Sequence, residues 1–489
     1  MGRSPNAYAL WIARVEPGVH AAILAKHPRH RPLIIPVVDC SARSADLTIA
    51  SIEDSGASAP MMLKEAGSAA DVADRLGDLV SSKGNWLCIV NAGDRLAKDA
   101  LDIYSSAAAH FPDSWVIYAD DDLIGEGGRR DPHFKPDWNP ELFEHHDFIT
   151  GSVIIRTTPD ILRELATSRS EDWQAALVRN ALKRGPPVHL PVVLHHRKSR
   201  PNPSVPPKPA LPAGRISPLV SVIVPTRNRL SLLRTCIEGV GRTAYPKVEL
   251  IVVNNDSDDP ATLAYFEALK SDGVKVLDVA GAFNFSAMNN LAAKHAKGEL
   301  LCFLNNDVEV IDGDWLSLLA LQAIKKDIGA VGARLLYPDG SVQHAGVVTG
   351  VGGGAGHAHR YQRDEETGYF LRDRLPQRVS AVTAACLLVA KDKFLDVGGF
   401  NEKDFPVAFN DVDLCLKLNA RGWQSFYEPR AILIHHESKS RGSDSAKENR
   451  DRFAKELAAL KRHWDTDQLR DPYHHPQLSP FCERFYVAL

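Results

Sequence analysis

The stretch Val220-Ser-Val-Ile-Val-Pro-Thr-Arg-Asn228 decides the fold that we expect for the C-terminal half of this chain. Its first part, Val220–Val224, is a β-branched and mostly apolar run, which is typical of a buried strand. Strand and helix patterns then alternate downstream. The further elements that we expect are helices at Leu230–Val240 and Ser286–Lys297 and strands at Val248–Val253, Val274–Leu277 and Leu300–Leu304. This alternation predicts an α/β fold with a mainly parallel sheet, helices on both of its faces, and ligands bound where the strands end.

Length and composition narrow the class of protein. A chain of 489 residues is too long for one ordinary core, so two domains are expected. A formal net charge of −3 gives no sign of a general affinity for nucleic acid. No apolar run approaches the roughly 20 residues that span a bilayer, and the first residues lead into no signal-peptide core. The seven cysteines are odd in number and form no C-x-x-C pair, which favours reduced thiols in a cytoplasmic protein. Loose association with the inner face of the cell membrane stays open.

The clearest domain boundary is the proline-rich stretch Ser199–Gly214. Its prolines remove backbone donors and favour extended chain, so we interpret it as a stiff linker; a long loop inside a single domain is the alternative. The expected division is a first domain at 1–198, a linker at 199–216, a second domain at 217–445 and a C-terminal helical extension at 446–489.

Polar clusters follow three of the expected strands: Pro225–Asn228, Asn254–Asp259 and Asn305–Asp307. Each cluster alone is an ordinary turn, because Asn, Asp and Ser favour turns. Together, at one edge of one sheet, they form an oxygen-rich site that suits Mg2+ or Mn2+. Such a cation would in turn hold a diphosphate.

A second group of candidate residues lies downstream, at Gly398–Glu402 and Phe409–Leu418. Asn410 is expected to cap a helix whose first turn holds Asp411 and Asp413, where the helix dipole favours ionised carboxylates. Such a carboxylate can accept a proton from an attacking hydroxyl. The alternative is that both aspartates only stabilise the start of the helix.

Two adjacent histidines, His435 and His436, follow an apolar run, Ala431–Ile434. Side chains alternate along a strand, so one imidazole can reach a metal or a diphosphate while the other points away. A surface position is the alternative.

These segments together resemble glycosyltransferase family 2, whose catalytic domain has the GT-A fold. The motifs that carry the resemblance are, in chain order, V-S-V-I-V-P-T-R-N, E-L-I-V-V-N-N-D-S-D-D-P, F-S-A-M-N-N-L-A-A, G-E-L-L-C-F-L-N-N-D, V-G-G-F-N-E, F-N-D-V-D-L-C-L-K and H-H-E-S-K-S-R-G. The segment Q-H-A-G-V-V-T-G-V-G-G-G-A-G-H-A-H-R also resembles members that build bacterial O-antigen, capsule or rhamnose-rich polymers.

The resemblance implies a role for each matching position. Asp411 would be the general base. Asp307, at the D-x-D position, would bind the metal together with His435, which we prefer over His436. The donor would be contacted by Thr226, Asn228, Asn254, Asn255, Asp256, Asn290, Asn305 and Asn306. The acceptor site would be shaped by Gly398, Gly399, Phe400, Asn401 and Asp413.

Two positions depart from the pattern of the family. Asn305-Asn306-Asp307 has one carboxylate where many relatives have two, so the cation would depend more on the diphosphate oxygens and on the histidine. The usual acidic residue at the end of the second strand is Asn254, which leaves the identity of the base open.

The activity that the resemblance implies is inverting glycosyl transfer. A hydroxyl of a saccharide or lipid-linked saccharide, deprotonated by Asp411, would attack the anomeric carbon of a nucleotide-diphosphate sugar, and Mn2+ or Mg2+ would stabilise the departing diphosphate. The product would extend a surface polysaccharide. Two other classes stay open. One is a sugar nucleotidyltransferase, which usually has a glycine-rich loop where this chain has Pro225-Thr-Arg-Asn-Arg229. The other is a non-catalytic carbohydrate-binding scaffold.

The N-terminal half resembles a degenerate copy, so we expect two tandem GT-A-like domains. Gly84–Asp94 shares the register of Gly298–Val308, but Gly93 stands where Asp307 would bind the metal. Two further parallels pair His195-His196 with His435-His436, and Glu171-Asp172 with Asn410-Asp411.

Nothing in residues 1–80 repeats the V-I-V-P-T-R-N entry to a nucleotide pocket. A diphosphate site that lacks both the metal-binding carboxylate and the residues that contact the nucleotide should not catalyse transfer. We therefore expect this half to pack, to position the acceptor or to mediate assembly. A second active site that uses Asp94 or Asp120–Asp122 for metal is one alternative, and chance similarity between the halves is the other.

Overall fold

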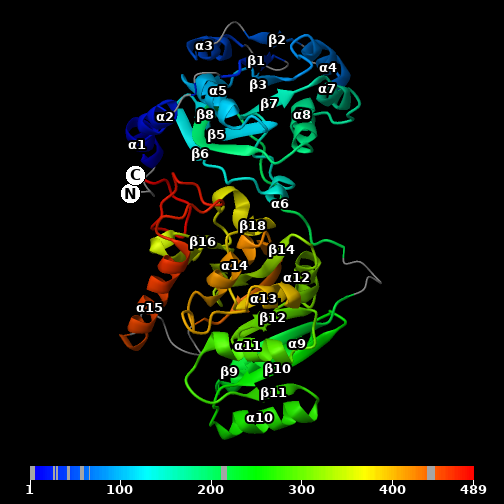
Figure 1. Ribbon diagram of the computed structural model, residues 1–489, viewed down its shortest axis with the longest axis vertical. Coiled ribbons are helices and arrows are strands. Elements are labelled where there is room, and N and C mark those ends of the chain that lie inside the picture. The colour runs from blue at the N-terminus through cyan, green and yellow to red at the C-terminus, as the bar shows by residue number, and fades with distance from the viewer. Residues whose placement is uncertain are drawn as a thin grey trace. The chain divides into compact units, whose positions relative to one another are not determined.

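The computed structural model describes residues 6–25, 28, 31–40, 45–55, 60–64, 67–210, 217–437 and 447–489. The chain divides into two compact units, each built around its own sheet (Figure 1). The first unit holds Met1–Asn202, His474–Ser479 and Tyr486–Leu489, and the second holds Pro203–Tyr473 and Pro480–Phe485. Three parts of the sequence predictions lie outside the described residues: 211–216 of the linker, 438–442 of the H-H-E-S-K-S-R-G motif, and residue 446 at the start of the extension.

The second unit begins with the strands and helices that the sequence predicts. Its strands are β9 (Val220–Thr226), β10 (Val248–Asn254), β11 (Lys275–Asp278), β12 (Leu300–Leu304), β13 (Val308–Val310), β14 (Ile328–Leu336), β15 (Val342–His344), β16 (Val347–Thr349), β17 (Ala355–His357), β18 (Gln377–Val379), β19 (Cys386–Ala390) and β20 (Gln424–His435). Its helices are α9 (Leu230–Gly241), α10 (Pro260–Ser271), α11 (Phe285–His295), α12 (Trp315–Ala323), α13 (Lys391–Asp396), α14 (Asn410–Ala420) and α15 (Lys447–Trp464), with 3-10 turns η1 (Val351–Gly353) and η2 (Tyr369–Arg374).

The main sheet of the second unit runs in the order β11-β10-β9-β12-β19-β14-β20-β13. The first four strands are parallel, as predicted, and Figure 1 shows α10 beyond the edge strand β11. Beyond β12 the sheet becomes mixed, because β19 runs antiparallel to both of its neighbours, β12 and β14. The three polar clusters therefore follow β9, β10 and β12, inside the parallel block.

Two apolar layers cover the faces of this sheet. Along β9, Val222 and Val224 pack with residues of α9 and α12, whereas Ile223 packs on the other face with residues of α11 and α14. This alternation explains why a run with few polar residues forms a central strand. Gly298 allows β12 to approach β9 closely, because a Cβ at this position would lie 2.5 Å from the backbone nitrogen of Ser221.

The first unit repeats this topology. Its strands are β1 (Ile34–Asp39), β2 (Met61–Leu63), β3 (Asn85–Asn91), β4 (Arg95–Leu96), β5 (Val116–Gly125), β6 (Gly128–His133), β7 (Val153–Thr157) and β8 (Val188–Arg197). Its helices are α1 (Ala7–Arg14), α2 (Glu16–Leu24), α3 (Asp46–Asp54), α4 (Ala69–Gly77), α5 (Ala100–His110), α6 (Pro140–Phe143), α7 (Pro159–Ala166) and α8 (Trp173–Leu182).

The sheet order β2-β1-β3-β7-β5-β8-β4 corresponds strand by strand to β10-β9-β12-β19-β14-β20-β13, with the same parallel and antiparallel pairs. The prediction of two tandem GT-A-like α/β domains is confirmed. Among the described residues, no helix is both long and apolar enough to cross a membrane.

Candidate active site

The carboxyl ends of β9, β10 and β12 meet at one edge of the sheet. Thr226, the last residue of β9, pairs with Asn254 of β10. Asn306, two residues after β12, donates its side-chain N–H to Thr226 Oγ1 over 2.8 Å. The polar clusters that the sequence predicts to converge are thus in contact.

A cavity of about 470 Å³ opens at this edge. The residues that line it include six of the predicted site residues: Thr226, Asn305, Asn306, Asp307, Asp411 and His435. The metal carboxylate, the histidine and the base of the sequence analysis therefore share one cavity, although they come from the turn after β12, from β20 and from α14.

Asp307 and His435 face each other in this cavity. His435 Nε2 lies 3.2 Å from Asp307 Oδ1, and both side chains are buried. The Nδ1 atom of His435 is buried without a hydrogen-bond partner. His436 lies on the other side of β20, where its Nε2 atom is 3.0 Å from Glu309 Oε2. Of the two histidines, only His435 lines the cavity in the part of the chain that the structure describes.

Asp411 stands in the first turn of α14, at the wall of the cavity. Its Oδ2 atom accepts the backbone N–H of Ala384 over 2.9 Å, and its Oδ1 atom accepts that of Val412 over 2.9 Å. Burial raises the pKa of this carboxyl, and these two hydrogen bonds oppose the shift. Asn410 does not cap the helix as predicted: the N-cap is Phe409, in a left-handed conformation, and the Asn410 amide donates to the Val407 carbonyl.

Several predicted donor contacts hold turns and do not line the cavity. The side-chain oxygen of Asn228, Oδ1, accepts the backbone N–H groups of Asp258 and Asp259, each over 3.0 Å. The Asn254 side chain bonds to Asp278 and to the backbone of Ser257. Neighbouring Asn255 and Asp256 bind the backbone of the loop at 279–281. These side chains shape the edge of the sheet, and none of them is among the described residues that line the cavity.

The predicted acceptor residues also pack away from the cavity. Asn290 of α11 and Phe400 exchange two hydrogen bonds, each 2.9 Å long, which fix the Gly398–Asn401 turn on α11. Asp413 accepts from Trp464 Nε1 over 2.9 Å and pairs with Lys417 over 3.0 Å, so it joins α14 to α15. None of these predicted residues lines the cavity among the residues described.

The cavity contains polar residues that the sequence analysis did not assign. They include Arg227, Gln343, His357, Arg360, Thr383, Glu437 and Glu483. Gln343, His357 and Arg360 belong to the Q-H-A-G…H-A-H-R segment, which was noted only as a resemblance. Glu483 had no sequence signal at all, because its place in the cavity depends on the path of the C-terminal tail.

Strand pairing aligns the first unit with this site. In the second unit, Cys302 of β12 pairs with Val222 of β9. In the first unit, Cys88 of β3 pairs with Pro36 of β1 in the corresponding place. This correspondence supports the predicted alignment of Gly84–Asp94 with Gly298–Val308. Gly93 is then the counterpart of Asp307. Further along, Glu309 pairs with Ile434, whereas its counterpart Arg95 pairs with His196.

The parallel drawn between the two histidine pairs is therefore wrong by two residues. His196 corresponds to Ile434, and Arg197 is the counterpart of His435. The guanidinium of Arg197 donates to the Thr150 carbonyl over 3.1 Å. A permanently charged side chain thus occupies the position of the histidine, beside a glycine in the position of the metal carboxylate.

The base also has a different counterpart from the one predicted. Asp172 is the N-cap of α8 and accepts the Ala175 N–H, so Glu171 and Asp172 precede the helix. Gln174 is the second residue of α8, just as Asp411 is the second residue of α14. Its side-chain N–H donates to Asp39 over 3.0 Å and to Asn91 over 2.7 Å. This position carries a neutral amide in the first unit.

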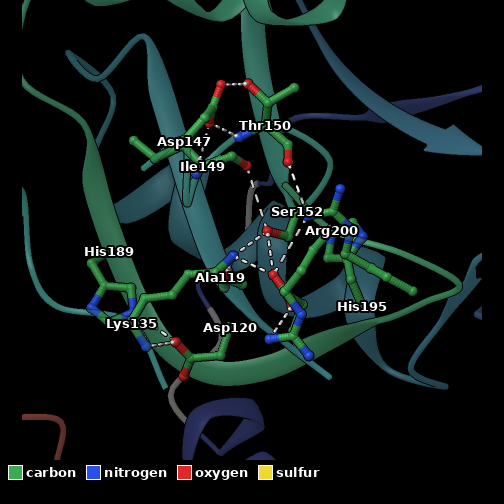
Figure 2. A network of polar contacts seen from close by, with 12 residues as sticks. Ala119, Asp120, Lys135, Asp147, Ile149, Thr150, Ser152, His189, His195 and Arg200 are labelled. Carbon is green, nitrogen blue, oxygen red and sulfur yellow. Dashed lines mark hydrogen bonds and ion pairs between the residues drawn. The ribbon is translucent and has the colours of Figure 1, made fainter. Parts of the chain in front are cut away.

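The three consecutive aspartates of β5, Asp120–Asp122, are buried and paired internally. Asp121 lies 2.8 Å from Lys135 Nζ and 3.2 Å from Arg200 Nη1. Lys135 also contacts Ser152 (Figure 2). Asp122 binds Arg129 and His196. These ion pairs leave the carboxylates little capacity to hold a catalytic metal.

Asp120, His189 and His475 bring three potential metal-ligand atoms within 4.8 Å of one another. His189 contacts Asp120 through Nε2 (Figure 2). It also contacts Asp137 through Nδ1, and two carboxylate partners are consistent with a proton on both ring nitrogens. The backbone N–H of Gln477 donates to His475 Nδ1, so that ring carries its proton on Nε2, toward Asp120. A cation at this place would have to displace the protons through which the two imidazoles contact Asp120.

Residues 221–385 match the family model described as Glycosyl transferase family 2. The O-antigen biosynthesis protein RfbC of Myxococcus xanthus is 31% identical over 545 aligned positions, which cover 96% of this chain and 42% of that protein. An uncharacterized protein of Sinorhizobium fredii, y4gI, is 38% identical over 446 residues, or 81% of this chain and 49% of that one. The chain thus spans half or less of the length of these two relatives.

Two further similarities are more limited. The N-acetylglucosaminyl-diphospho-decaprenol L-rhamnosyltransferase of Mycobacterium tuberculosis is 34% identical over 149 residues, which cover 29% of this chain and 48% of that one. The solved structure of a mannosyltransferase from Pyrobaculum calidifontis, in complex with GDP-Man and Mn2+, is 19% identical, with a TM-score of 0.39 over 54% of this chain and 68% of that one.

Proposed function

Because the C-terminal unit of this chain is a member of glycosyltransferase family 2, we propose that it transfers a sugar from a nucleotide-diphosphate donor to a hydroxyl of a growing surface polysaccharide, with inversion at the anomeric carbon. One observation carries the proposal: Asp307, His435 and Asp411, which lie far apart in the sequence, line the same cavity. They supply a cation ligand, its partner and a base to one reaction centre.

Asp307 and His435 are the residues that would hold a divalent cation, Mn2+ or Mg2+. Their facing atoms, Asp307 Oδ1 and His435 Nε2, lie 3.2 Å apart, which places a carboxylate oxygen and an imidazole nitrogen to share one cation, so the donor set fits. When bound, the cation would neutralise the charge that develops on the departing diphosphate. Thr226 and Asn306, joined by a hydrogen bond at the strand ends, would lie beside the donor.

Asp411 would accept the proton of the attacking hydroxyl. Its carboxylate is held by two backbone N–H groups, which fix its orientation. Because burial raises its pKa, the carboxylate is a stronger base than one in water. The attacking oxygen must therefore lie between Asp411 and the anomeric carbon.

The curated relatives support the kind of acceptor. RfbC is named for O-antigen biosynthesis, and the mycobacterial enzyme for a sugar-diphosphate lipid. We propose a saccharide or lipid-linked saccharide as the acceptor, with the chain acting in the cytoplasm and, for a lipid-linked acceptor, at the inner face of the membrane.

The first unit has no catalytic role in this proposal. In the first unit, Gly93, Arg197 and Gln174 occupy the positions of Asp307, His435 and Asp411. The carboxylates of Asp120–Asp122 form buried ion pairs within the unit. We propose that it serves to position the acceptor or to mediate assembly.

A donor screen tests the proposal. The protein is mixed with UDP-, GDP- and dTDP-sugars, with Mn2+ or Mg2+ and with a chelator, and the release of nucleoside diphosphate is followed. The proposal expects release from at least one donor that stops when the chelator is added. Pyrophosphate formed from a sugar phosphate and a nucleoside triphosphate would instead identify a sugar nucleotidyltransferase. If no donor binds or turns over, the proposal fails, and binding of a saccharide alone would then favour a carbohydrate-binding scaffold.

A further inference from the structure

The cavity of the second unit has a group of polar side chains that the proposed chemistry does not use. Gln343, His357, Arg360, Glu437 and Glu483 line it together with the catalytic candidates. They come from the segment after β14, from the residues after β20 and from the C-terminal tail. We call these five residues the tail-side group.

Arg360 and Glu437 form the rigid part of the tail-side group. Arg360 Nη2 lies 3.1 Å from each carboxylate oxygen of Glu437, and Arg360 Nε donates to the Tyr337 hydroxyl over 2.9 Å. That hydroxyl donates to Glu437 Oε2 over 2.7 Å. The Arg360 guanidinium also lies 5.1 Å from the ring centroid of Tyr361, which stacks on Tyr337. These contacts fix both side chains and balance their charges.

Glu483 adds a second carboxylate from the tail. Its Oε1 atom accepts the backbone N–H of His357 over 2.9 Å and lies 3.9 Å from Arg360 Nη1. His357 Nδ1 is 2.9 Å from His344 Nδ1, and burial lowers the pKa of His357 to about 4, so this ring is neutral near pH 7. The tail-side group thus has one positive charge and two negative ones.

Gln343 offers an open hydrogen-bond acceptor. The residue is 3% exposed and lines the cavity, and its side-chain oxygen is buried with no hydrogen-bond partner. Leaving such an oxygen unpaired is unfavourable, because burial has removed its hydrogen bonds to water. A donor from a ligand would remove this cost.

From these contacts we infer that the tail-side group is a subsite for the acceptor saccharide, which it binds through neutral ring hydroxyls, and that the C-terminal tail completes this subsite with Glu483. Carboxylate and amide oxygens accept hydrogen bonds from hydroxyl groups, and charged acceptors form the stronger ones. The excess negative charge disfavours a phosphate or diphosphate group at this place.

The identification of the bound sugar as the acceptor rests on the proposed function. The donor diphosphate would occupy the part of the cavity at Asp307 and His435, next to the strand ends. A second sugar in the same cavity, held by residues from other segments, would then be the acceptor. Its hydroxyl would be the one that Asp411 deprotonates.

Sugar binding can be measured separately from nucleotide binding. The full chain is titrated, without added metal, with methyl α-L-rhamnoside, methyl α-D-mannoside and methyl β-D-glucoside, and saturation-transfer NMR reports the bound sugar. At least one glycoside should bind at millimolar concentration, and pyrophosphate should not displace it. Glu483→Gln keeps an acceptor for the His357 N–H but removes the charge, and it should weaken binding about tenfold, as should Glu437→Gln.

Glu366→Gln is the matched control. Glu366 pairs with Arg484 of the same tail over 2.7 Å and does not line the cavity, so this variant should bind the glycoside within about twofold of the unchanged protein. The inference is overturned if no glycoside binds at up to about ten times the millimolar range. It is also overturned if pyrophosphate displaces the bound glycoside, or if Glu483→Gln and Glu437→Gln both bind the glycoside normally.

A separate titration with UDP and GDP in the presence of Mn2+ reports on the donor site alone. Failure of both nucleotides to bind would count against the proposed function and leave the glycoside result standing. Nucleotide binding together with unchanged glycoside binding in both variants would count against the subsite alone.

Discussion

Asp411 joins two properties that a base needs, a fixed orientation and a carboxylate withdrawn from water. Its oxygens accept from Ala384 and Val412, so replacement by Asn keeps the size and one acceptor but removes the basicity. We expect Asp411→Asn to lower kcat about 10²–10⁴-fold, with Mn2+-dependent binding of the nucleoside diphosphate largely unchanged. Transfer assays and calorimetric titration check the two parts. Turnover at the normal rate would remove Asp411 from the mechanism.

The same carboxyl should set the acidic limb of the pH profile. Burial raises the pKa of Asp411, and the base acts only when ionised. The value of kcat/KM should therefore fall as pH is lowered, with a midpoint above about 3.9, the ordinary value for aspartate. Steady-state rates across the pH range, within the range where the fold is intact by circular dichroism, measure this limb. The residual activity of Asp411→Asn should lack it.

The adjacent histidines form a matched pair for testing the metal site. His435 faces Asp307 in the cavity, whereas His436 contacts Glu309 on the opposite side of β20. We expect His435→Ala to weaken Mn2+-dependent nucleotide binding at least about tenfold, because one cation ligand is lost. His436→Ala should stay within about twofold. Equal losses from the two substitutions would indicate that neither effect comes from the cation.

Among the elements, the parallel strands were predictable because apolar runs and turn residues are local signals. Leu300–Leu304 coincides with β12, and the helices after β9 and before β12 lie within two residues of their predicted bounds. The convergence of Thr226 and Asp307 followed from the rule that parallel strands end at one edge. Asp411 lies in the first turn of a helix, and its role was implied by the family resemblance alone.

Register and side-chain direction were not predictable in the same way. When β8 is aligned with β20 by strand pairing, His195 and His196 fall two residues before the positions that correspond to His435 and His436. The sequence alone does not reveal this shift. Asn228 and Asn254 have the residue types of ligand contacts, yet their amides hold turns. Glu483 enters the cavity from the tail, a contact that no local pattern encodes.

The buried pairs of β5 predict how the first unit is stabilised. Lys135 is fully buried, lies 2.8 Å from Asp121 and donates to the Ala119 carbonyl over 2.7 Å. Lys135→Met would leave a buried carboxylate with its remaining partners Arg197 and Arg200, so we expect a loss of about 3 kcal/mol in the free energy of unfolding of this unit. Urea unfolding measures it.

The exposed Lys98 provides the control for this change, and Lys98→Met should alter the free energy of unfolding by no more than about 0.5 kcal/mol. Nucleotide binding by the second unit should survive both substitutions under conditions where the first unit stays folded. A stability change of equal size for Lys98→Met would show that the buried pair is not its source.

At the scale of the whole chain, two sheets share one strand order, but among the described residues only the second unit carries those that we propose for metal, base and nucleotide. The counterparts in the first unit are a glycine, an arginine and a glutamine, and Gln174 bridges Asp39 and Asn91 where Asp411 faces a cavity. Repetition of the topology without the side chains separates the architectural role of the fold from its chemistry.

This asymmetry predicts one donor site per chain. Calorimetric titration of the full chain with UDP, GDP or dTDP in the presence of Mn2+ should give a stoichiometry of one, because the first unit pairs its buried aspartates internally and has Arg197 in the position of His435. Asp307→Asn should remove this binding altogether. Asp94→Asn in the first unit should leave it intact, since Asp94 accepts the Lys198 backbone N–H and belongs to the local fold. Two nucleotides per chain, or residual binding in Asp307→Asn, would mean that the first unit holds a working site of its own. In that case its carboxylates would have to exchange their internal partners for a cation.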